Sequence, residues 1–153
     1  MGTTTTDPTF EVLSADECRR LLATRQLGRI GLTGGRFPLI LPVNYAVDGD
    51  VIVVRTDSRS VLAAATDDGR VAFEVDEIDE RTRSGWSVLA QAVAHEVTAA
   101  DRDDLLVRTR ASGVEPWAPG DRGHWIRLVP LHLTGRRIVP GQLPPPFEDG
   151  SYL

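Results

Sequence analysis

The sequence predicts a mainly β domain that closes into a barrel. Short apolar runs bounded by turn residues give about seven strand patterns, whereas few segments have helical spacing. Two dipeptides typical of hairpin turns, Gly34-Gly35 and Asp48-Gly49, separate neighbouring strand patterns. Many short strands joined by hairpins are typical of antiparallel barrels. Prolines within the strand patterns argue against a flat, regular sheet.

Composition limits what this domain can do. Its 153 residues suit one domain with a single core. The net charge of −5 argues against general binding to nucleic acids or anionic membranes. All 17 basic residues are arginine, so a bound phosphate must be held by arginines, hydroxyl groups or backbone N–H groups. The single cysteine excludes an internal disulfide and a cysteine-based metal cluster.

The source and location of the protein are also suggested by composition. Arginine and alanine have GC-rich codons, so the exclusive use of arginine suggests a bacterial genome rich in GC. No apolar run reaches the length of a membrane helix, and no secretory h-region follows Met1. We therefore expect a cytoplasmic protein.

A helix is expected near the N-terminus, after a flexible arm at residues 1–12. Ser14-Ala15-Asp16-Glu17 has the residues of a capping box, which satisfies free N–H groups of a first helical turn. The helical pattern ends near Gln26 and places three apolar residues on one face: Cys18, Leu21 and Leu22.

Three strands are expected next. The first covers Gly28–Thr33 and the third covers Asp50–Thr56. The second covers Phe37–Val47, and its two prolines, Pro38 and Pro42, predict an edge or a bulge.

The middle of the chain has a helical segment and two more strands. Arg59–Thr66 has helical spacing, and Val71–Asp76 alternates apolar and acidic residues as a half-solvated strand does. Glu77–Ser84 is too polar for the core and is interpreted as a loop. Gly85 then turns the chain into a long strand, Trp86–Thr98.

The last part of the chain adds a helix, two strands and a tail. Asp101–Ser112 has acidic residues in its first turn and basic residues in its last, as helices favour. Two strands are expected on either side of Pro130: His124–Val129 and Leu131–Val139. A proline-rich extended tail occupies residues 140–153, so the expected folded domain covers residues 13–139.

Several short segments are informative through their order and spacing. They are Leu27–Leu32, Pro38 with Pro42–Tyr45, Val54–Thr56, Phe73–Asp76 with Gly85–Val88, and the closing strands Arg127–Pro130 and Thr134–Ile138. Together they span about residues 14–139. In this arrangement the chain resembles the pyridoxamine 5'-phosphate oxidase-like family of flavin-binding split barrels, and more narrowly its nitroimidazole-reductase-related branch.

The resemblance implies both a fold and a function. The implied fold is a six-stranded antiparallel Greek-key split barrel that forms a homodimer, with FMN bound at the dimer interface. The implied function is that of an FMN-dependent oxidoreductase, which acts on an unidentified small molecule with a nicotinamide reductant. Two alternatives stay open for the cofactor, a deazaflavin or none. The alternative function is a non-enzymatic dimer that binds flavin or another planar cofactor as a store, a sensor or a degenerate homologue.

The resemblance also implies where the flavin binds. One strand runs along the flavin ring, mainly through backbone atoms: Pro42, Val43, Asn44 and Tyr45. A second segment contributes to the same pocket, with its tryptophan as a wall: Trp86, Ser87 and Val88. A third group reaches the phosphate: Arg55, Thr56, Arg59 and Ser60. This third group lies at a strand–helix junction, where free N–H groups favour an anion, although a solvated hairpin end has the same residues.

Val61 departs from the family pattern, because it stands where the family has a phosphate-binding lysine. Either Arg59 supplies the second charge, or the site has decayed. Alternatively, Val61 is the apolar anchor of the Arg59–Thr66 helix.

Other chemistry has little support in the sequence. The three histidines, His95, His124 and His132, are dispersed without helical i,i+4 spacing, so no metal site is expected. His124-Trp125 precedes a closing strand where the family sometimes has a cofactor contact. Nucleophile-elbow, P-loop and Rossmann patterns are missing. The sequence identifies no catalytic residue, which suits a protein whose flavin carries the redox chemistry.

Overall fold

The structure is a computed structural model that describes residues 8–33, 35–56, 59, 61, 63, 69–110 and 124–141. In these residues, six antiparallel strands close into a barrel in the order β7-β4-β3-β2-β5-β6, because β6 pairs back onto β7. The mainly β fold and the six-stranded antiparallel barrel are thereby confirmed. The strands are β1 Thr9–Leu13, β2 Leu27–Leu32, β3 Leu39–Asp48, β4 Val51–Thr56, β5 Arg70–Asp79, β6 Ser84–Glu96 and β7 His124–Val139, and the helices are α1 Ala15–Leu22 and α3 Ala99–Arg110.

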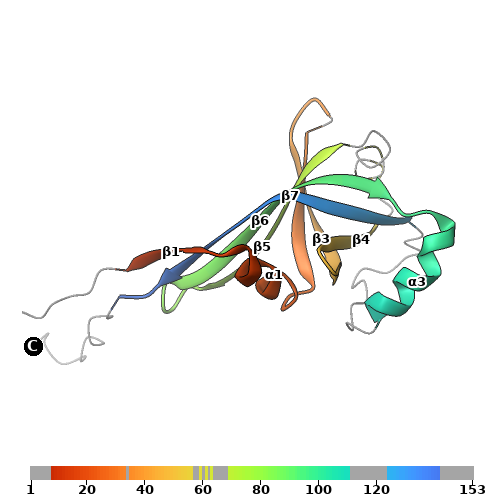
Figure 1. Ribbon diagram of the computed structural model, residues 1–153. Helices are drawn as coiled ribbons and strands as arrows, with labels where there is room; N and C mark the ends of the chain where they lie inside the picture. Colours follow the sequence, from red (N-terminus) through yellow and green to blue (C-terminus); the bar gives the residue numbers. More distant parts are fainter. Residues whose placement is uncertain are drawn as a thin grey trace, which may run out of the picture.

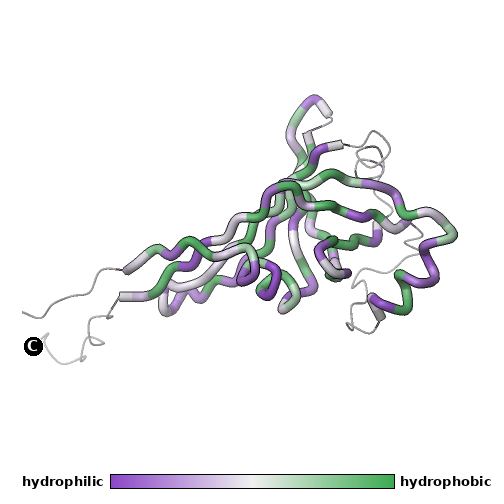
Figure 2. The backbone as a smooth tube through the Cα atoms, viewed as in Figure 1, coloured by the Kyte–Doolittle hydropathy of each residue, from purple (hydrophilic) through white to green (hydrophobic). Residues whose placement is uncertain are grey.

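The barrel continues on one side into a long ribbon of strands (Figure 1). This ribbon, here called the extension, consists of β1, the hairpin end of β5 and β6, and the second half of β7. Helix α1 lies at its base, and α3 lies at the opposite end of the molecule. Hydrophobic and hydrophilic stretches alternate along the extension (Figure 2), as expected of strands whose successive side chains point to opposite faces.

Among the described residues, two apolar clusters stabilise the barrel. The larger fills the interior, where the rings of Tyr45 and Phe73 meet edge to face with their centres 5.0 Å apart. The smaller lies outside β4 and contains Leu105 of α3, so it attaches that helix to the outer wall. Its buried members are Val53, Val97, Leu105 and Trp125.

Strand β7 is one continuous strand, so the prediction of two strands separated by Pro130 was wrong. Across the β6–β7 ladder, Gln91 pairs with His132 and Ala92 pairs with Pro130, which leaves Leu131 as an extra residue. This β-bulge lies next to the proline, whose nitrogen has no hydrogen to donate. The bulge therefore accommodates the proline without ending the strand.

Part of the expected N-terminal arm is also a strand. Thr9–Leu13 forms β1 and pairs with Gly135–Val139 of β7. Strand β4 pairs with the first part of β7, from His124 to Leu128, and β1 pairs with the last part, from Gly135 to Val139. Strand β1 therefore depends on pairing with β7, which is far away in the sequence, so the residues of β1 alone do not reveal it.

The β5–β6 hairpin differs from its prediction in the position of the turn. β5 continues to Asp79, and the turn lies at residues 80–83, with Arg83 at a positive φ of 54°. Gly85 is a strand residue opposite Ile78. A Cβ atom there would collide with the carbonyl oxygen of Glu77, so close strand packing explains the glycine.

Two other predictions of local structure agree with the structure closely. Ser14 caps α1 by accepting a 3.2 Å hydrogen bond from the Glu17 backbone N–H. The helix ends at Leu22 rather than near Gln26, whose carbonyl accepts from the Tyr45 backbone N–H. The Asp48-Gly49 hairpin is confirmed, with Gly49 at a φ of 61°.

The first predicted hairpin is looser than expected, and the tail lies mostly outside the described residues. Leu32 pairs with Leu39, so residues 33–38 connect β2 to β3 instead of a tight Gly34-Gly35 turn. Gly34, Ser60, most of the Arg59–Thr66 helix and the tail from residue 142 lie outside the described residues.

Candidate functional site

Three side chains lie in a row on the outer face of the barrel. Neighbouring residues of a strand point to opposite faces, and Tyr45 and Val54 fill the interior, so Asn44 and Arg55 point outward. Trp125 of β7 is paired with Arg55 of β4 and therefore shares its face. The row crosses three strands: Asn44 on β3, Arg55 on β4 and Trp125 on β7.

The cation of Arg55 lies over the ring of Trp125. The guanidinium carbon is 4.9 Å from the ring centre, within the range of a cation–π contact. Trp125 is only 6% exposed and packs with Val53 and Leu105. Thr109 of α3 lines the same small cavity as the three residues of the row. The row thus presents a positive charge, held between α3 and the strands, that suits an anionic group.

The other predicted phosphate residues differ in exposure. Thr56 follows Arg55 and is 2% exposed, whereas Arg59 is exposed at a helical position. Ser60 lies outside the described residues. Val61 is fully buried in the main core cluster, as the apolar-anchor interpretation requires.

The β3 segment presents its backbone more than its side chains. Val43 and Tyr45 are buried, and the Tyr45 hydroxyl donates a 2.5 Å hydrogen bond to the Leu22 carbonyl. This burial also raises the pKa of the Tyr45 hydroxyl. Among the described residues, β4 pairs with β3 only from Tyr45 to Asp48, so Pro42 lies where one side of β3 has no partner strand. This edge position agrees with the prediction from its proline.

Trp86, Ser87 and Val88 lie on β6, and the structure separates them by face. Val88 is fully buried in the core, and Trp86 packs against the same cluster. The Trp86 indole N–H donates to Glu77 Oε2 at 3.2 Å. Ser87 is on the outer face, paired with Arg136. Within one chain, therefore, Ser87 points out of the barrel as Arg55 does, whereas Trp86 points inward.

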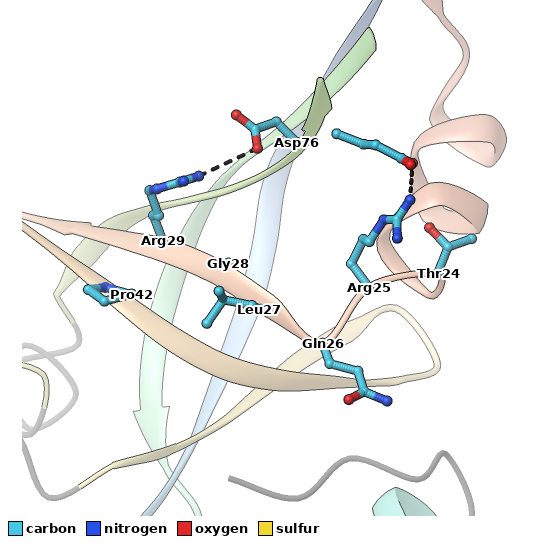
Figure 3. A pocket seen from close by; sticks show the side chains of 9 residues that line it. Thr24, Arg25, Gln26, Leu27, Gly28, Arg29, Pro42 and Asp76 are labelled. Carbon is cyan, nitrogen blue, oxygen red and sulfur yellow. Dashed lines mark ion pairs between the residues drawn. The ribbon is translucent and has the colours of Figure 1, made fainter. Parts of the chain in front are cut away.

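A cavity of about 480 Å³ opens beside Pro42, where the chain passes from α1 into β2 (Figure 3). Its lining residues are Thr24, Arg25, Gln26, Leu27, Gly28, Arg29, Pro42, Asp76 and Glu77. Arg25 pairs with Glu77, and Arg29 lies 3.5 Å from a carboxylate oxygen of Asp76. Sequence reasoning did not select Arg25 or Arg29 as site residues, although Arg29 belongs to one of the segments that carry the resemblance.

Charges around this cavity are largely paired. Arg29 also donates to Glu74 at 3.3 Å, so one guanidinium serves two carboxylates. Burial, and then the negative charge of Asp76, raise the pKa of Glu74. The hydrogen bond from Arg25 lowers the pKa of Glu77.

The outer face of the barrel and the extension also carries many exposed apolar side chains. Strand pairing links Ile78 through Gly85 to Ile138 and then to Phe10, so these residues form a row across four strands. Alternation along the strands places further apolar side chains on this face. The exposed apolar residues of the outer face are Phe10, Val12, Leu27, Ile40, Ile78, Leu89 and Ile138.

Within the described part of the chain, no three His, Cys, Asp or Glu side chains come together as metal ligands. His124 instead pairs with Glu96, with 3.0 Å between Nδ1 and Oε1. Among the described helices, none combines the length and apolar character needed to cross a bilayer.

Comparison with known proteins gives consistent matches over most of the chain. The family model described as pyridoxamine 5'-phosphate oxidase matches residues 14–137. An uncharacterized protein of Mycobacterium tuberculosis is 35% identical over 132 residues, which are 83% of this chain and 84% of the relative.

Two solved structures are also similar. The first is a putative pyridoxamine 5'-phosphate oxidase of Corynebacterium glutamicum, which is 28% identical with a TM-score of 0.70, over 87% of this chain and 96% of that one. The second is an FAD-binding protein of Mycobacterium smegmatis, which is 31% identical with a TM-score of 0.62, over 84% of this chain and 98% of that one.

Proposed function

This chain belongs to the pyridoxamine 5'-phosphate oxidase family, and we propose that it binds FMN and acts as a flavin-dependent oxidoreductase on a small molecule. The single observation that carries the proposal is the outward-facing Arg55 beside Asn44, at the edge of the strand that the family lays along the flavin. The FAD-binding relative from Mycobacterium smegmatis supports a flavin as the cofactor class.

The residues present fit a flavin phosphate and a planar ring. Arg55 supplies a cation that would form charge-assisted hydrogen bonds to a phosphate, and the exposed Arg59, four residues later in the chain, adds a second positive charge. The open edge of β3 at Pro42 leaves backbone groups for the polar rim of the ring. The side chains of Val43 and Tyr45 remain in the core, so they contribute through their backbone.

In this proposal the protein binds and orients the flavin and the substrate, and the flavin supplies the hydride and electron transfer. A nicotinamide reductant delivers the electrons, and we place the reaction in the cytoplasm, where such reductants are available. The 480 Å³ cavity beside Pro42 is adjacent to the proposed ring position and offers space for the substrate.

We also propose that a second copy of the chain completes the pocket. Arg55, Ser87 and the exposed apolar row of the extension all point out of the barrel, and in this proposal the partner is seated so that it covers all three. Ser87 then contributes its side chain, and the buried Val88 contributes its backbone alone. Trp86 enters the pocket only if the indole leaves its hydrogen bond to Glu77.

The second candidate function is a flavin-binding dimer without turnover, and the burial of Val61 favours it. With Val61 in the core, the position of the family's lysine provides no charge, and the phosphate depends on Arg55 and Arg59. A weaker cofactor site is what a store or a degenerate homologue would have.

An absorbance spectrum of the purified protein tests the proposal. Flavin bands, followed by mass spectrometry of the released cofactor, would support it and would distinguish FMN from FAD or a deazaflavin. A colourless protein whose melting temperature does not rise with added FMN would refute flavin binding. Oxidation of NADPH in the presence of an electron acceptor then separates an oxidoreductase from a store.

A further inference from the structure

We propose that Trp125 is a positioning residue, which holds the Arg55 guanidinium in place for the phosphate before the flavin binds. This inference rests on the proposed function, because it assigns a role to a residue that acts through Arg55. It explains why an aromatic residue on β7 stands opposite the arginine on β4.

The backbone brings the two side chains together. Arg55 and Trp125 are direct partners in the antiparallel β4–β7 ladder, so their side chains leave the sheet on the same face and next to each other. The guanidinium carbon lies 4.9 Å from the ring centre. At this distance a planar guanidinium is attracted to the negative face of an indole, the most favourable aromatic ring for such a contact.

The indole itself is firmly held. Trp125 is 6% exposed and packs against Val53 and Leu105. The Trp125 carbonyl accepts a 2.8 Å hydrogen bond from the Val97 backbone N–H. With so little of the ring open to solvent and Arg55 over it, Trp125 has little surface for a ligand of its own. Its influence on a bound flavin therefore passes through the arginine.

Helix α3 completes this support. Arg108 donates to both carboxylate oxygens of Asp48, at 3.0 and 3.1 Å, and so ties the end of α3 to the β3–β4 hairpin. Leu105 and Thr109 of the same helix face Trp125 and the cavity beside Arg55. A free arginine side chain loses rotamer entropy when it binds a phosphate. Stacking on a fixed ring already restricts the arginine side chain, so less rotamer entropy is lost when the ligand binds.

The test compares FMN with riboflavin, which has the same ring but no phosphate. Isothermal titration gives both dissociation constants for wild type, Trp125→Leu and Trp125→Phe. Trp125→Leu should reduce the preference for FMN over riboflavin by about tenfold, the scale of a desolvated cation–π contact. Trp125→Phe retains a ring of weaker attraction, so its loss should be smaller. Riboflavin affinity should stay close to that of wild type in both.

A double-mutant cycle shows whether Trp125 acts through Arg55. In an Arg55→Ala background, Trp125→Leu should cause no further loss of FMN preference. Val97→Ala is the matched control, since it removes packing from the same cluster but keeps both the ring and the arginine. It should lower the melting temperature and leave the FMN-to-riboflavin ratio unchanged.

The outcomes separate this inference from the proposed function. If wild type prefers FMN and both Trp125 variants keep that preference, the positioning role is refuted while flavin binding stands. Equal losses for FMN and riboflavin would assign Trp125 a structural role only. If wild type binds neither flavin, the proposed function fails and the inference fails with it. Should Trp125→Leu not fold, the Trp125→Phe ratio and its cycle with Arg55→Ala still decide.

Discussion

Arg55 is the residue on which the proposed phosphate site most depends. Arg55→Ala should weaken FMN binding by about 1.5–3 kcal/mol, the scale of a hydrogen bond to a charged group. Folding should change less, because the side chain lies at a strand end on the outer face. Titration calorimetry measures the affinity and thermal melting measures the stability. Arg36→Ala is a suitable control, because Arg36 also lies near an aromatic ring, that of Phe37, at 5.7 Å. Equal FMN affinity in Arg55→Ala and wild type would remove Arg55 from the site.

Val61 decides between two interpretations of the helix after β4. Because its side chain is fully buried, Val61→Lys should place an unpaired charge in the core and cost about 2–4 kcal/mol of folding free energy. We expect a lower melting temperature and no gain in FMN affinity. Val61→Met, similar in length but uncharged, should be destabilised less. A Val61→Lys protein that is as stable as wild type and binds FMN more tightly would instead restore the lysine position of the family.

The residue types near the site were predictable from the sequence, but the directions in which their side chains point were not. Asn44 and Tyr45 were predicted together, yet burial of the tyrosine leaves the asparagine as the outward-facing side chain. The pairing of Arg55 with Trp125 depends on the register of two strands far apart in the sequence. No local pattern encodes that register, because it is set by how the whole barrel closes.

At the scale of the elements, Glu17 fastens α1 to the extension. Its carboxylate accepts hydrogen bonds of 2.7 Å from Arg20 and 2.8 Å from Arg137 of β7. These contacts lower the pKa of Glu17 from 4.5 to about 2. A carboxylate whose pKa is lowered by folding stabilises the folded protein at pH values above its pKa in the unfolded chain. That stability is lost as the pH falls through its pKa in the folded protein. Attachment of α1 should therefore weaken between about pH 4.5 and pH 2.

The variant Glu17→Gln tests this pH dependence, because glutamine does not titrate. Its melting temperature should be below that of wild type at pH 7, and the difference should shrink as the pH approaches 2. Asp16→Asn is a matched control in the same helical turn, since Asp16 is 95% exposed and pairs with Arg19 rather than with β7. If the difference between wild type and Glu17→Gln is the same at pH 7 and pH 2, the ion pairs to Arg137 do not stabilise the fold.

Elements were predicted well where local chemistry determines them and poorly where a partner does. The Ser14 cap and the Asp48-Gly49 turn are local, and both were confirmed. Strand β1 required the edge of β7, and the bulge at Leu131 required the ladder with β6. Position 85 requires a glycine because the facing strand lies too close for a Cβ atom. A single sequence cannot show that close approach.

At the scale of the whole molecule, the extension is difficult to explain in an isolated chain. Its inner face is covered at the base by α1, but its outer face exposes Val12 at 83% and Ile78 at 67%. Such an apolar face on a thin ribbon costs solvation free energy unless another surface covers it. Arg55 and Ser87 also point out of the barrel, and in the proposed dimer the second copy that covers the apolar row reaches them as well and encloses the flavin site.

Dimerisation and flavin binding should therefore be lost together. Ile78→Asp places a charge at the β5 end of the apolar row and should convert a dimer of the 16.7 kDa chain to monomers in sedimentation velocity at micromolar concentration. A stable dimer should bury about 2,000 Å² or more, so an unpaired charge within the buried apolar row is not easily accommodated. FMN affinity should fall in parallel.

Val107→Asp is the matched control for this experiment. Val107 is β-branched like Ile78 and similarly exposed, at 71%, but it lies on α3, on the side of that helix away from the buried Leu105. That variant should remain dimeric and keep its FMN affinity, which separates the outer face from a general effect of surface charge. A wild-type protein that sediments only as a monomer, or an Ile78→Asp monomer that binds FMN as tightly as wild type, would show that one chain builds the pocket alone.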